Sequence, residues 1–378
     1  MDRNYPDQKS KEKISPFLLR NMTTALTSDA HSKFLYFYED ELKTIQRIKL
    51  NIFSGVAENW TTSELVTLAV GKVEGLAVDW VAGNLYWSDS RFQQIMVSRE
   101  DGRYPFTLIS EAVSKPRSLV VHPTKRFVFW CDVDEDMPRI ERCGLDGSRR
   151  QSIVTGNKAR TPRALAIDFQ DDRLYWTDGI IIHYGKLNGT GQFCLHSSGR
   201  SAVRSLIIFN NYIIWSDVVG RLHTAHKEYS KGQEQMDGGI AFFVDLVYHD
   251  ESCQPMTTNP CAINNGNCDH LCLPNKTGYR CVCALGYWNF NGRCISGVGE
   301  ERFLIFADQR QAGIYQRPLF LDEYYSIPLQ NIKQPRDVVY DGVKKLIYWS
   351  DIALSTISRS KINGSNQEII FYHARMSK

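Results

Sequence analysis

The sequence predicts an all-β protein in three parts: a β-propeller, a small module held together by disulfides, and the start of a second propeller. Three observations predict this organisation. A pair of apolar strands recurs roughly every 40 to 50 residues, which is the size of a propeller blade. Aromatic residues make up 12% of the chain, and six of the ten cysteines fall between Cys261 and Cys294. At 378 residues, the chain is long enough for two or three domains.

The first strand of the repeat is an apolar segment that often opens with Pro-Arg and often ends near an Asp. It occurs at residues 73–80, 116–123, 162–169, 203–210, 243–250 and 335–342, with a weaker copy at 22–29. A strand that is apolar along its whole length suits the innermost position of a blade, which neighbouring blades cover on both faces.

The second strand is aromatic and ends in an acidic residue. It occurs at residues 85–89, 128–132, 174–178, 214–217 and 347–351. Asp-Gly and Asn-Gly pairs later in the units, at Asp146 and Asn363, are strong hairpin signals. We therefore expect blades of about four antiparallel strands, with aromatic rings filling the wedges between blades.

An acidic residue that returns at blade spacing indicates architecture rather than catalysis. The carboxylate can accept hydrogen bonds from backbone groups of a neighbouring blade and so fix the angle between blades. The predicted structural residues are Asp89, Asp132, Asp178, Asp217 and Asp351.

The repeated Tyr-Trp-Ser/Thr-Asp with Pro-Arg-x-Leu resembles the YWTD (class B) repeats of the low-density-lipoprotein receptor family. That resemblance implies a six-bladed propeller followed by an EGF-like module. The expected parts are a disordered or stray N-terminal segment at 1–20, a YWTD propeller at 21–252, an EGF-like module at 257–296 and a partial second YWTD propeller at 301–378.

The first propeller is expected to be incomplete. In the family, a strand like the one at Phe303 opens a propeller and later closes its ring, and no convincing counterpart precedes the first repeat. The second propeller stops after roughly one blade. Because unpaired strand edges favour aggregation, we expect this chain to be a truncated product or gene model that expresses poorly.

The six clustered cysteines allow fifteen pairings by spacing alone. Resemblance to EGF modules selects three pairs, Cys261–Cys272, Cys268–Cys281 and Cys283–Cys294. The stretch at 256–260 lacks the acidic motif of calcium-binding EGF modules, and the spacing does not suit zinc, so neither metal nor cofactor is expected.

Four further cysteines lie outside the module. Cys131 and Cys143 flank an acidic loop within one blade, and we expect them to bridge adjacent strands. The sequence leaves open whether Cys194 and Cys253 pair with each other.

Several features favour the secretory route. Disulfides persist in oxidising compartments, and five glycosylation sequons are predicted, at Asn21, Asn59, Asn188, Asn275 and Asn363. The chain shows neither a secretory signal nor an apolar run long enough for a membrane helix. We expect the full-length protein at the cell surface, on the extracellular side, with its membrane anchor outside this chain.

In a propeller, the loops that enter the inner strands surround one mouth of the central channel. The corresponding positions are Thr24, Glu74, Arg117, Arg163, Arg204 and Val244. Three arginines against one glutamate predict a mainly cationic mouth that binds an acidic or polar loop of a protein ligand. The alternative is that these arginines brace loops by binding backbone carbonyl groups.

The resemblance implies the ligand-binding region of a cell-surface receptor. The propeller–EGF–propeller order favours a Wnt co-receptor type, whose partners would be secreted Wnt-type ligands, antagonists or lipoproteins and a possible co-receptor. Related Wnt co-receptors carry Trp-Pro-Asn at one entry loop, whereas this chain has Thr161-Pro-Arg163. The alternatives are an endocytic lipoprotein or yolk-protein receptor and a nidogen-like matrix protein.

Other function classes are disfavoured. The net charge of +3 is too small for a nucleic-acid-binding face. Some six-bladed propellers are calcium-dependent hydrolases, but the entry positions here supply mostly arginine, and no Ser-His-Asp constellation is present. We therefore expect no enzyme activity.

Overall fold

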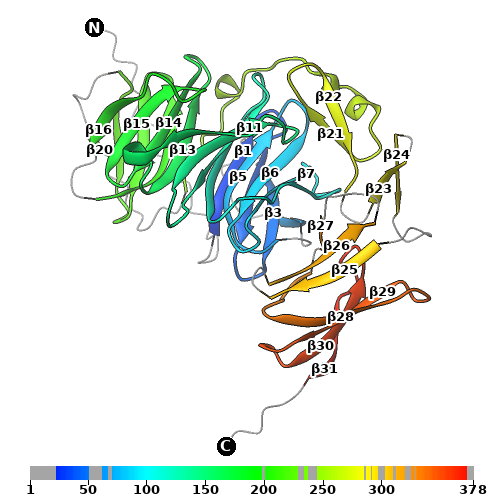
Figure 1. The fold of residues 1–378 in the computed structure, drawn as a ribbon. Coiled ribbons are helices and arrows are strands. Elements are labelled where there is room, and N and C mark those ends of the chain that lie inside the picture. Colours follow the sequence, from blue (N-terminus) through cyan, green and yellow to red (C-terminus); the bar gives the residue numbers. More distant parts are fainter. Residues whose placement is uncertain are drawn as a thin grey trace, which may run out of the picture.

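The computed structural model describes residues 23–50, 62–66, 70–197, 201–228, 234–236, 245–284, 287–290, 292–296, 303–309, 312–319, 325–327 and 329–372. The predicted N-terminal segment at 1–20, two sequons (Asn21 and Asn59) and Val244 lie outside these residues. The described chain is built almost entirely of short antiparallel strands, as predicted (Figure 1).

Five four-stranded antiparallel sheets follow one another in chain order and form blades around a central channel. Blade 1 consists of β1 (Thr23–Asp29), β2 (Phe34–Glu39), β3 (Thr44–Lys49) and β4 (Thr62–Val66). Blade 2 consists of β5 (Val73–Asp79), β6 (Asn84–Asp89), β7 (Gln94–Arg99) and β8 (Phe106–Ile109). Blade 3 consists of β9 (Pro116–His122), β10 (Phe127–Asp132), β11 (Arg139–Gly144) and β12 (Gln151–Thr155), followed by the 3₁₀ turn η2 (Gly156–Lys158).

The next two blades repeat this pattern. Blade 4 consists of β13 (Pro162–Asp168), β14 (Arg173–Asp178), β15 (Ile181–Lys186) and β16 (Phe193–Ser197). Blade 5 consists of β17 (Val203–Phe209), β18 (Tyr212–Asp217), β19 (Leu222–His226) and β20 (Glu234–Met236). In each blade the first strand is the innermost, as the inner-strand residues of all five blades line the channel.

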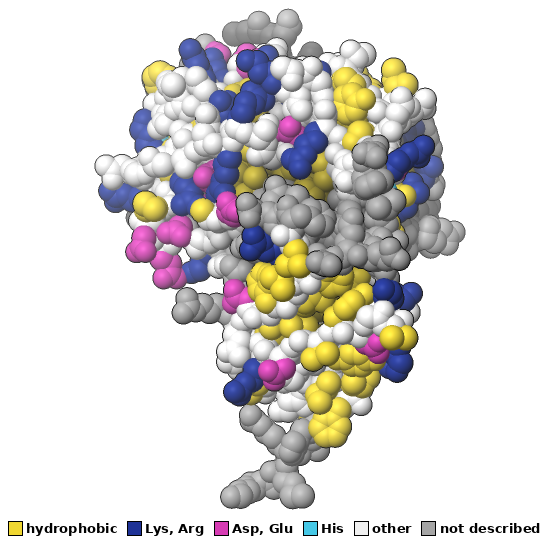
Figure 2. Space-filling model, turned by 45° about the vertical axis from the view of Figure 1, so that its right-hand side comes forward, with side chains coloured by type: hydrophobic (Ala, Val, Ile, Leu, Met, Phe, Trp, Pro, Cys, Tyr) yellow, Lys and Arg dark blue, Asp and Glu magenta, His cyan; other side chains and the backbone are white. Residues whose placement is uncertain are grey.

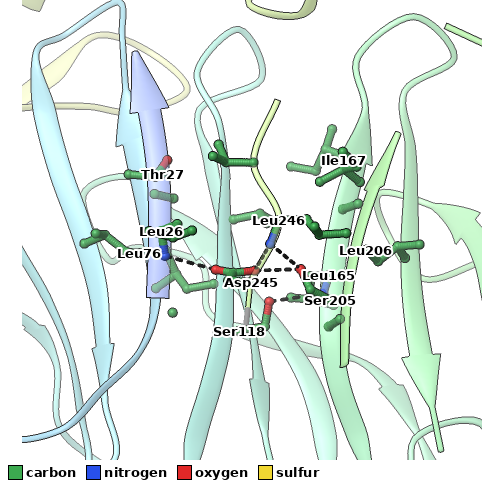
Figure 3. A pocket seen from close by; sticks show the side chains of 18 of the residues that line it. Leu26, Thr27, Leu76, Ser118, Leu165, Ile167, Ser205, Leu206, Asp245 and Leu246 are labelled. Atoms are coloured by element: carbon green, nitrogen blue, oxygen red, sulfur yellow. Dashed lines mark hydrogen bonds between the residues drawn. The ribbon is translucent and has the colours of Figure 1, made fainter. Parts of the chain in front are cut away.

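Residues 245–250 occupy a sixth inner position, between β17 and β1, without forming a regular strand. The Asp245 carboxylate accepts hydrogen bonds from Leu26 N in blade 1 (3.0 Å) and from Ser205 Oγ in blade 5 (2.6 Å) (Figure 3). Ser28 Oγ donates to Tyr248 O at 3.1 Å. The ring therefore closes through six positions, of which five are complete blades in the described part of the chain.

The aromatic pair of each repeat explains how the blades pack. Neighbouring residues of a strand point to opposite faces. Trp87 accordingly packs against blade 1, whereas Tyr86 packs against blade 3 and donates its hydroxyl hydrogen bond to Leu145 O at 3.0 Å. The same arrangement recurs in the next two wedges, and Trp87, Trp130, Trp176 and Trp215 are fully buried.

Most of the repeat aspartates accept hydrogen bonds from the connector that leads into their own blade. This connector is the segment just before the inner strand. Asp89 accepts hydrogen bonds from Gly71 N (2.6 Å) and Lys72 N (3.1 Å). Asp132, Asp178 and Asp351 accept equivalent bonds from residues 114–115, 160–161 and 333–334. Asp217 instead accepts bonds from the turn of its own hairpin and from the Arg221 side chain.

The 3₁₀ turn η3 (Glu251–Cys253) precedes the cysteine-rich module. The module contains η4 (Pro260–Ala262), η5 (Asn264–Asn267) and two hairpins, β21 (Leu271–Pro274) with β22 (Tyr279–Val282) and β23 (Tyr287–Phe290) with β24 (Arg293–Ser296). The three predicted disulfides are confirmed: Cys261–Cys272, Cys268–Cys281 and Cys283–Cys294. The module packs on blades 2 and 3 through an apolar cluster that includes Leu271 and Leu273. The His270 ring stacks on the Tyr104 ring of the propeller, with the two ring centroids 4.1 Å apart.

The predicted Cys131–Cys143 disulfide is wrong, because both cysteines are free and buried. The register of β10 and β11 places Cys143 opposite Val128, whereas Cys131 lies opposite Ile140. Residues 128 and 131 are an odd number of positions apart, so their side chains leave opposite faces of the blade. Cys143 joins the core towards blade 2, and Cys131 joins the core towards blade 4. Cys194 and Cys253 are also free.

The C-terminal unit begins with a three-stranded sheet of β25 (Phe303–Asp308), β26 (Gly313–Pro318) and β27 (Tyr325–Ser326). A blade of β28 (Pro335–Asp341), β29 (Leu346–Asp351), β30 (Thr356–Lys361) and β31 (Glu368–Tyr372) follows and packs against this sheet. Hydrophobic side chains gather on this unit in Figure 2, and Leu304, Val339 and Phe371 are more than half exposed. Apolar surface of this kind is typical of interaction or aggregation sites.

One buried carboxyl group predicts a pH dependence of stability. Asp79 closes the turn after β5 by accepting hydrogen bonds from Val81 N and Ala82 N at Oδ1, while Oδ2 has no partner in the described structure. Burial raises the pKa of Asp79 to about 6. Since the unfolded value is lower, Asp79 contributes stability below about pH 4 that is lost as the pH rises to about 6.

Asp79→Asn should therefore stabilise the protein near neutral pH, by on the order of 1–3 kcal/mol, and this gain should shrink as the pH falls below about 5. The measurement is urea unfolding across this pH range. Asp341→Asn is the matched control, because Asp341 makes the same turn contacts at an exposed site. A gain that is independent of pH would contradict the prediction.

Candidate functional site

The mouth residues lie at the second position of each inner strand. In blades 2 to 5 the pairing between the inner strand and its neighbour is irregular at this point, with register shifts between Val73 and Gly75, Pro116 and Leu119, Pro162 and Leu165, and Val203 and Ser205. A β-bulge redirects side chains at the end of a strand. All four predicted residues line the channel, namely Glu74, Arg117, Arg163 and Arg204.

The channel behind the mouth has a volume of about 260 Å³ and is walled mainly by aliphatic side chains and backbone of the inner strands. Two of its serine side chains are hydrogen-bonded within the channel wall. Ser118 Oγ accepts a hydrogen bond from Leu165 N at 3.1 Å, and Ser205 Oγ donates to Asp245. Figure 3 shows Asp245 between the first blade and the fifth, and Ser118 of blade 3 facing Leu165 of blade 4. Apart from Asp245, the charged residues that line the channel lie at its mouth.

Blades 2 and 3 form the more neutral half of the mouth. The Glu74 carboxylate lies 2.8 Å from Lys72 Nζ and 3.9 Å from an Arg117 guanidinium nitrogen. Ser88 Oγ donates to Arg117 O at 2.6 Å and so fixes the backbone that carries this arginine. Sequence reasoning missed Lys72, because it precedes the repeated strand and so lies outside the positions that were compared between the repeats.

Blades 4 and 5 form the cationic half. Within the described residues, neither Arg163 nor Arg204 has a carboxylate in ion-pair range. Desolvation at the mouth is the main cause that lowers the pKa of Arg163. The positive charges of Arg117 and Arg204 lower it further. The alternative predicted role, in which the arginines brace backbone carbonyl groups, has no contact in its favour at these two residues.

The described sequons lie at turns. Asn188 is exposed, and Asn275 and Asn363 are partly buried, each with its amide oxygen accepting hydrogen bonds from the Ser or Thr two residues later. Glycosylation of these residues stays a prediction, as does the ligand-binding role of the mouth.

A family model described as low-density lipoprotein receptor repeat class B matches residues 126–169, which run from the start of β10 to the end of β13. The vitellogenin receptor Yl of Drosophila melanogaster is 33% identical over 228 residues, or 59% of this chain. Part of the chain is therefore similar to the low-density-lipoprotein receptor family. The chain spans 11% of the length of the Drosophila relative.

The propeller fold also matches a solved structure. A chain in the crystal structure of a nidogen/laminin complex aligns with a TM-score of 0.51 at 21% identity, covering 57% of this chain and 78% of that chain. At this identity, the match supports the propeller fold alone. A gluconolactonase from Xanthomonas campestris aligns with a TM-score of 0.46 at 14% identity, covering 57% of this chain and 75% of that chain.

The described residues contain no group of three or more His, Cys, Asp or Glu side chains placed to hold a metal ion. They also contain no helix with the length and hydrophobicity required to cross a membrane.

Proposed function

We propose that this chain is part of the extracellular ligand-binding region of a cell-surface receptor. Its propeller mouth would bind an acidic loop of a protein ligand. The observation that carries the proposal is the charge of the mouth, where three arginines face one glutamate. Rigid guanidinium groups suit carboxylates, and a cationic rim accelerates the encounter with an acidic partner.

Among receptor types, an endocytic receptor for yolk protein or lipoprotein is now favoured over a Wnt co-receptor. The similarity to an insect vitellogenin receptor supports this choice. The entry loop of blade 4 also supports it, because Arg163 stands where related Wnt co-receptors carry an asparagine. A Wnt co-receptor and a matrix protein remain the alternatives for the test.

The experiment measures binding of the immobilised chain to purified vitellogenin, with a secreted Wnt antagonist and a laminin fragment as the competing probes. We expect vitellogenin to bind, and the double variant Arg163→Glu/Arg204→Glu to weaken binding at least about 30-fold, or about 2 kcal/mol. Binding should also fall as salt is raised.

Arg149→Glu is the matched control, because Arg149 is an exposed arginine of the β11–β12 turn that does not line the channel. This variant should bind with an affinity within about twofold of that of the unsubstituted chain, since exposed charges far from a contact contribute little. Absence of binding, or equal binding by the double variant, would refute the proposed role of the mouth. Binding of the Wnt antagonist alone would favour the co-receptor type.

A further inference from the structure

Cys194 is an exposed free thiol on β16, the outermost strand of blade 4. The strand register places it directly opposite His183 of β15, and His183 in turn lies opposite Trp176 of β14. Residues directly opposite each other share a face of the sheet, with Cβ atoms about 4.5–5.5 Å apart. The three side chains therefore form one row, which runs from the apolar core between blades 3 and 4 to the solvent.

The imidazole in the middle of this row has unused polar atoms. His183 is 5% exposed, and neither ring nitrogen makes a hydrogen bond of regular geometry within the described residues. Its ring stacks on the Trp176 ring, with the centroids 5.5 Å apart and the planes inclined by 22°. Trp176 therefore covers the imidazole on the side of β14, and Cys194 is its neighbour on the side of β16. A buried polar group without a partner is uncommon and calls for an explanation.

Blade 5 contains the same histidine–tryptophan stack without the cysteine. His223 stacks on Trp215 with the ring centroids 5.3 Å apart, but the residue opposite it on β20 is Gln235. The Nε2 atom of His223 lies 3.2 Å from the Asp217 carboxylate. The ring of His223 therefore has a structural partner, whereas the ring of His183 is paired across the strands with a thiol-bearing residue.

The surroundings of His183 leave its imidazole able to accept a proton near pH 7. Burial lowers the pKa of His183 and the charge of Lys158 lowers it further, whereas Asp178 and the backbone of Phe193 raise it. Because the net shift is downwards, the ring is mostly neutral at pH 7. The Lys158 ammonium group donates to Gln192 O at 2.9 Å, close to the start of β16. A positive charge near a thiol favours the thiolate, which is its reactive form.

We propose that Cys194 is a modification site, at which the thiol exchanges with the disulfide of a small thiol compound and forms a mixed disulfide. His183 accepts the proton of the Cys194 thiol, and the thiolate attacks one sulfur of the external disulfide. The external S–S bond breaks as the new S–S bond forms, and the departing thiolate takes the proton from the imidazolium. The external disulfide is itself the oxidant, so no other co-reactant is needed. This inference does not depend on the proposed function of the mouth.

The test incubates the folded full chain with glutathione disulfide at pH 7 and pH 9, and mass spectrometry of peptides follows each thiol. The other free cysteines are internal controls, because Cys131 and Cys143 are buried and burial raises the pKa of the half-buried Cys253. We expect Cys194 to react at least about tenfold faster than Cys253 at pH 7. His183→Gln should slow Cys194 at least about fivefold at pH 7 but less than about twofold at pH 9, where the thiolate forms without a neighbouring base.

His223→Gln is the matched control, because it removes the equivalent stack in blade 5 and should leave the rate of Cys194 within about twofold. If His183→Gln does not fold, the ratio of the Cys194 and Cys253 rates in the unsubstituted chain decides. Equal rates for Cys194 and Cys253, equal slowing by the two histidine variants, or disulfide-linked dimers in place of the mixed disulfide would overturn the proposal.

Discussion

Asp245→Ala is expected to lower the free energy of unfolding of the propeller by about 3–5 kcal/mol, because it removes the acceptor that closes the ring. The partly buried Asp245 carboxylate accepts hydrogen bonds from Leu26 N, Ser205 Oγ and Leu246 N. Alanine would leave Leu26 N and Ser205 Oγ without this acceptor, whereas Leu246 N also donates to Ser205 Oγ at 3.0 Å. Each such loss costs about 1–3 kcal/mol when water cannot replace the acceptor.

Urea unfolding followed by tryptophan fluorescence measures this effect, since four fully buried tryptophans report on the blades. Asp136→Ala is the control: Asp136 is an exposed acidic residue of blade 3, and its replacement should change stability by less than about 0.5 kcal/mol. Asp245→Asn keeps one acceptor oxygen, so its free energy of unfolding should lie between those of Asp245→Ala and Asp136→Ala. If Asp245→Ala unfolds at the same urea concentration as the control, the ring does not depend on this residue.

The regular spacing of the repeated strand pair made much of the fold predictable. A strand with apolar residues on both faces, followed by an aromatic strand ending in Asp, specifies a blade wherever it occurs, and five such blades are present. The repeat spacing also located Arg117, Arg163 and Arg204, because in blades 2 to 5 the residue after the opening Pro or Val lines the channel. The disulfides of the small module followed from resemblance, since spacing leaves fifteen pairings open.

The error and the omission have different physical reasons. Cys131 and Cys143 are close in sequence, but the strand register decides which face each side chain leaves, and the loop between them does not reveal that register. The ion pair of Lys72 with Glu74 is local, because residues two positions apart in an extended segment lie on the same face. The repeat pattern omitted it because the repeated segment begins at Val73.

A second long-range contact gives the last prediction, which concerns the interface between blades 4 and 5. Lys227 follows β19 and is 3% exposed; its Nζ lies 2.7 Å from Asp168 Oδ2 and 2.9 Å from Asp171 Oδ2. Burial disfavours the charge of Lys227, but the hydrogen bonds to Asp168 and Asp171 outweigh it and raise the pKa of the ammonium group. Asp168 also closes the turn after β13 by accepting from Gln170 N and Asp171 N.

Lys227→Met should destabilise the propeller by about 3–5 kcal/mol, because it leaves the buried Asp168 carboxylate without a counter-charge. The double variant Asp168→Asn/Lys227→Met should recover most of this loss, since asparagine keeps the turn hydrogen bonds and a neutral pair needs no compensation. Urea unfolding of Lys227→Met, Asp168→Asn and the double variant completes a double-mutant cycle with the unsubstituted chain. If Lys227→Met is no less stable than the double variant, the buried ion pair is not what holds blade 5 against blade 4, and the interface depends instead on the apolar contacts around Trp215.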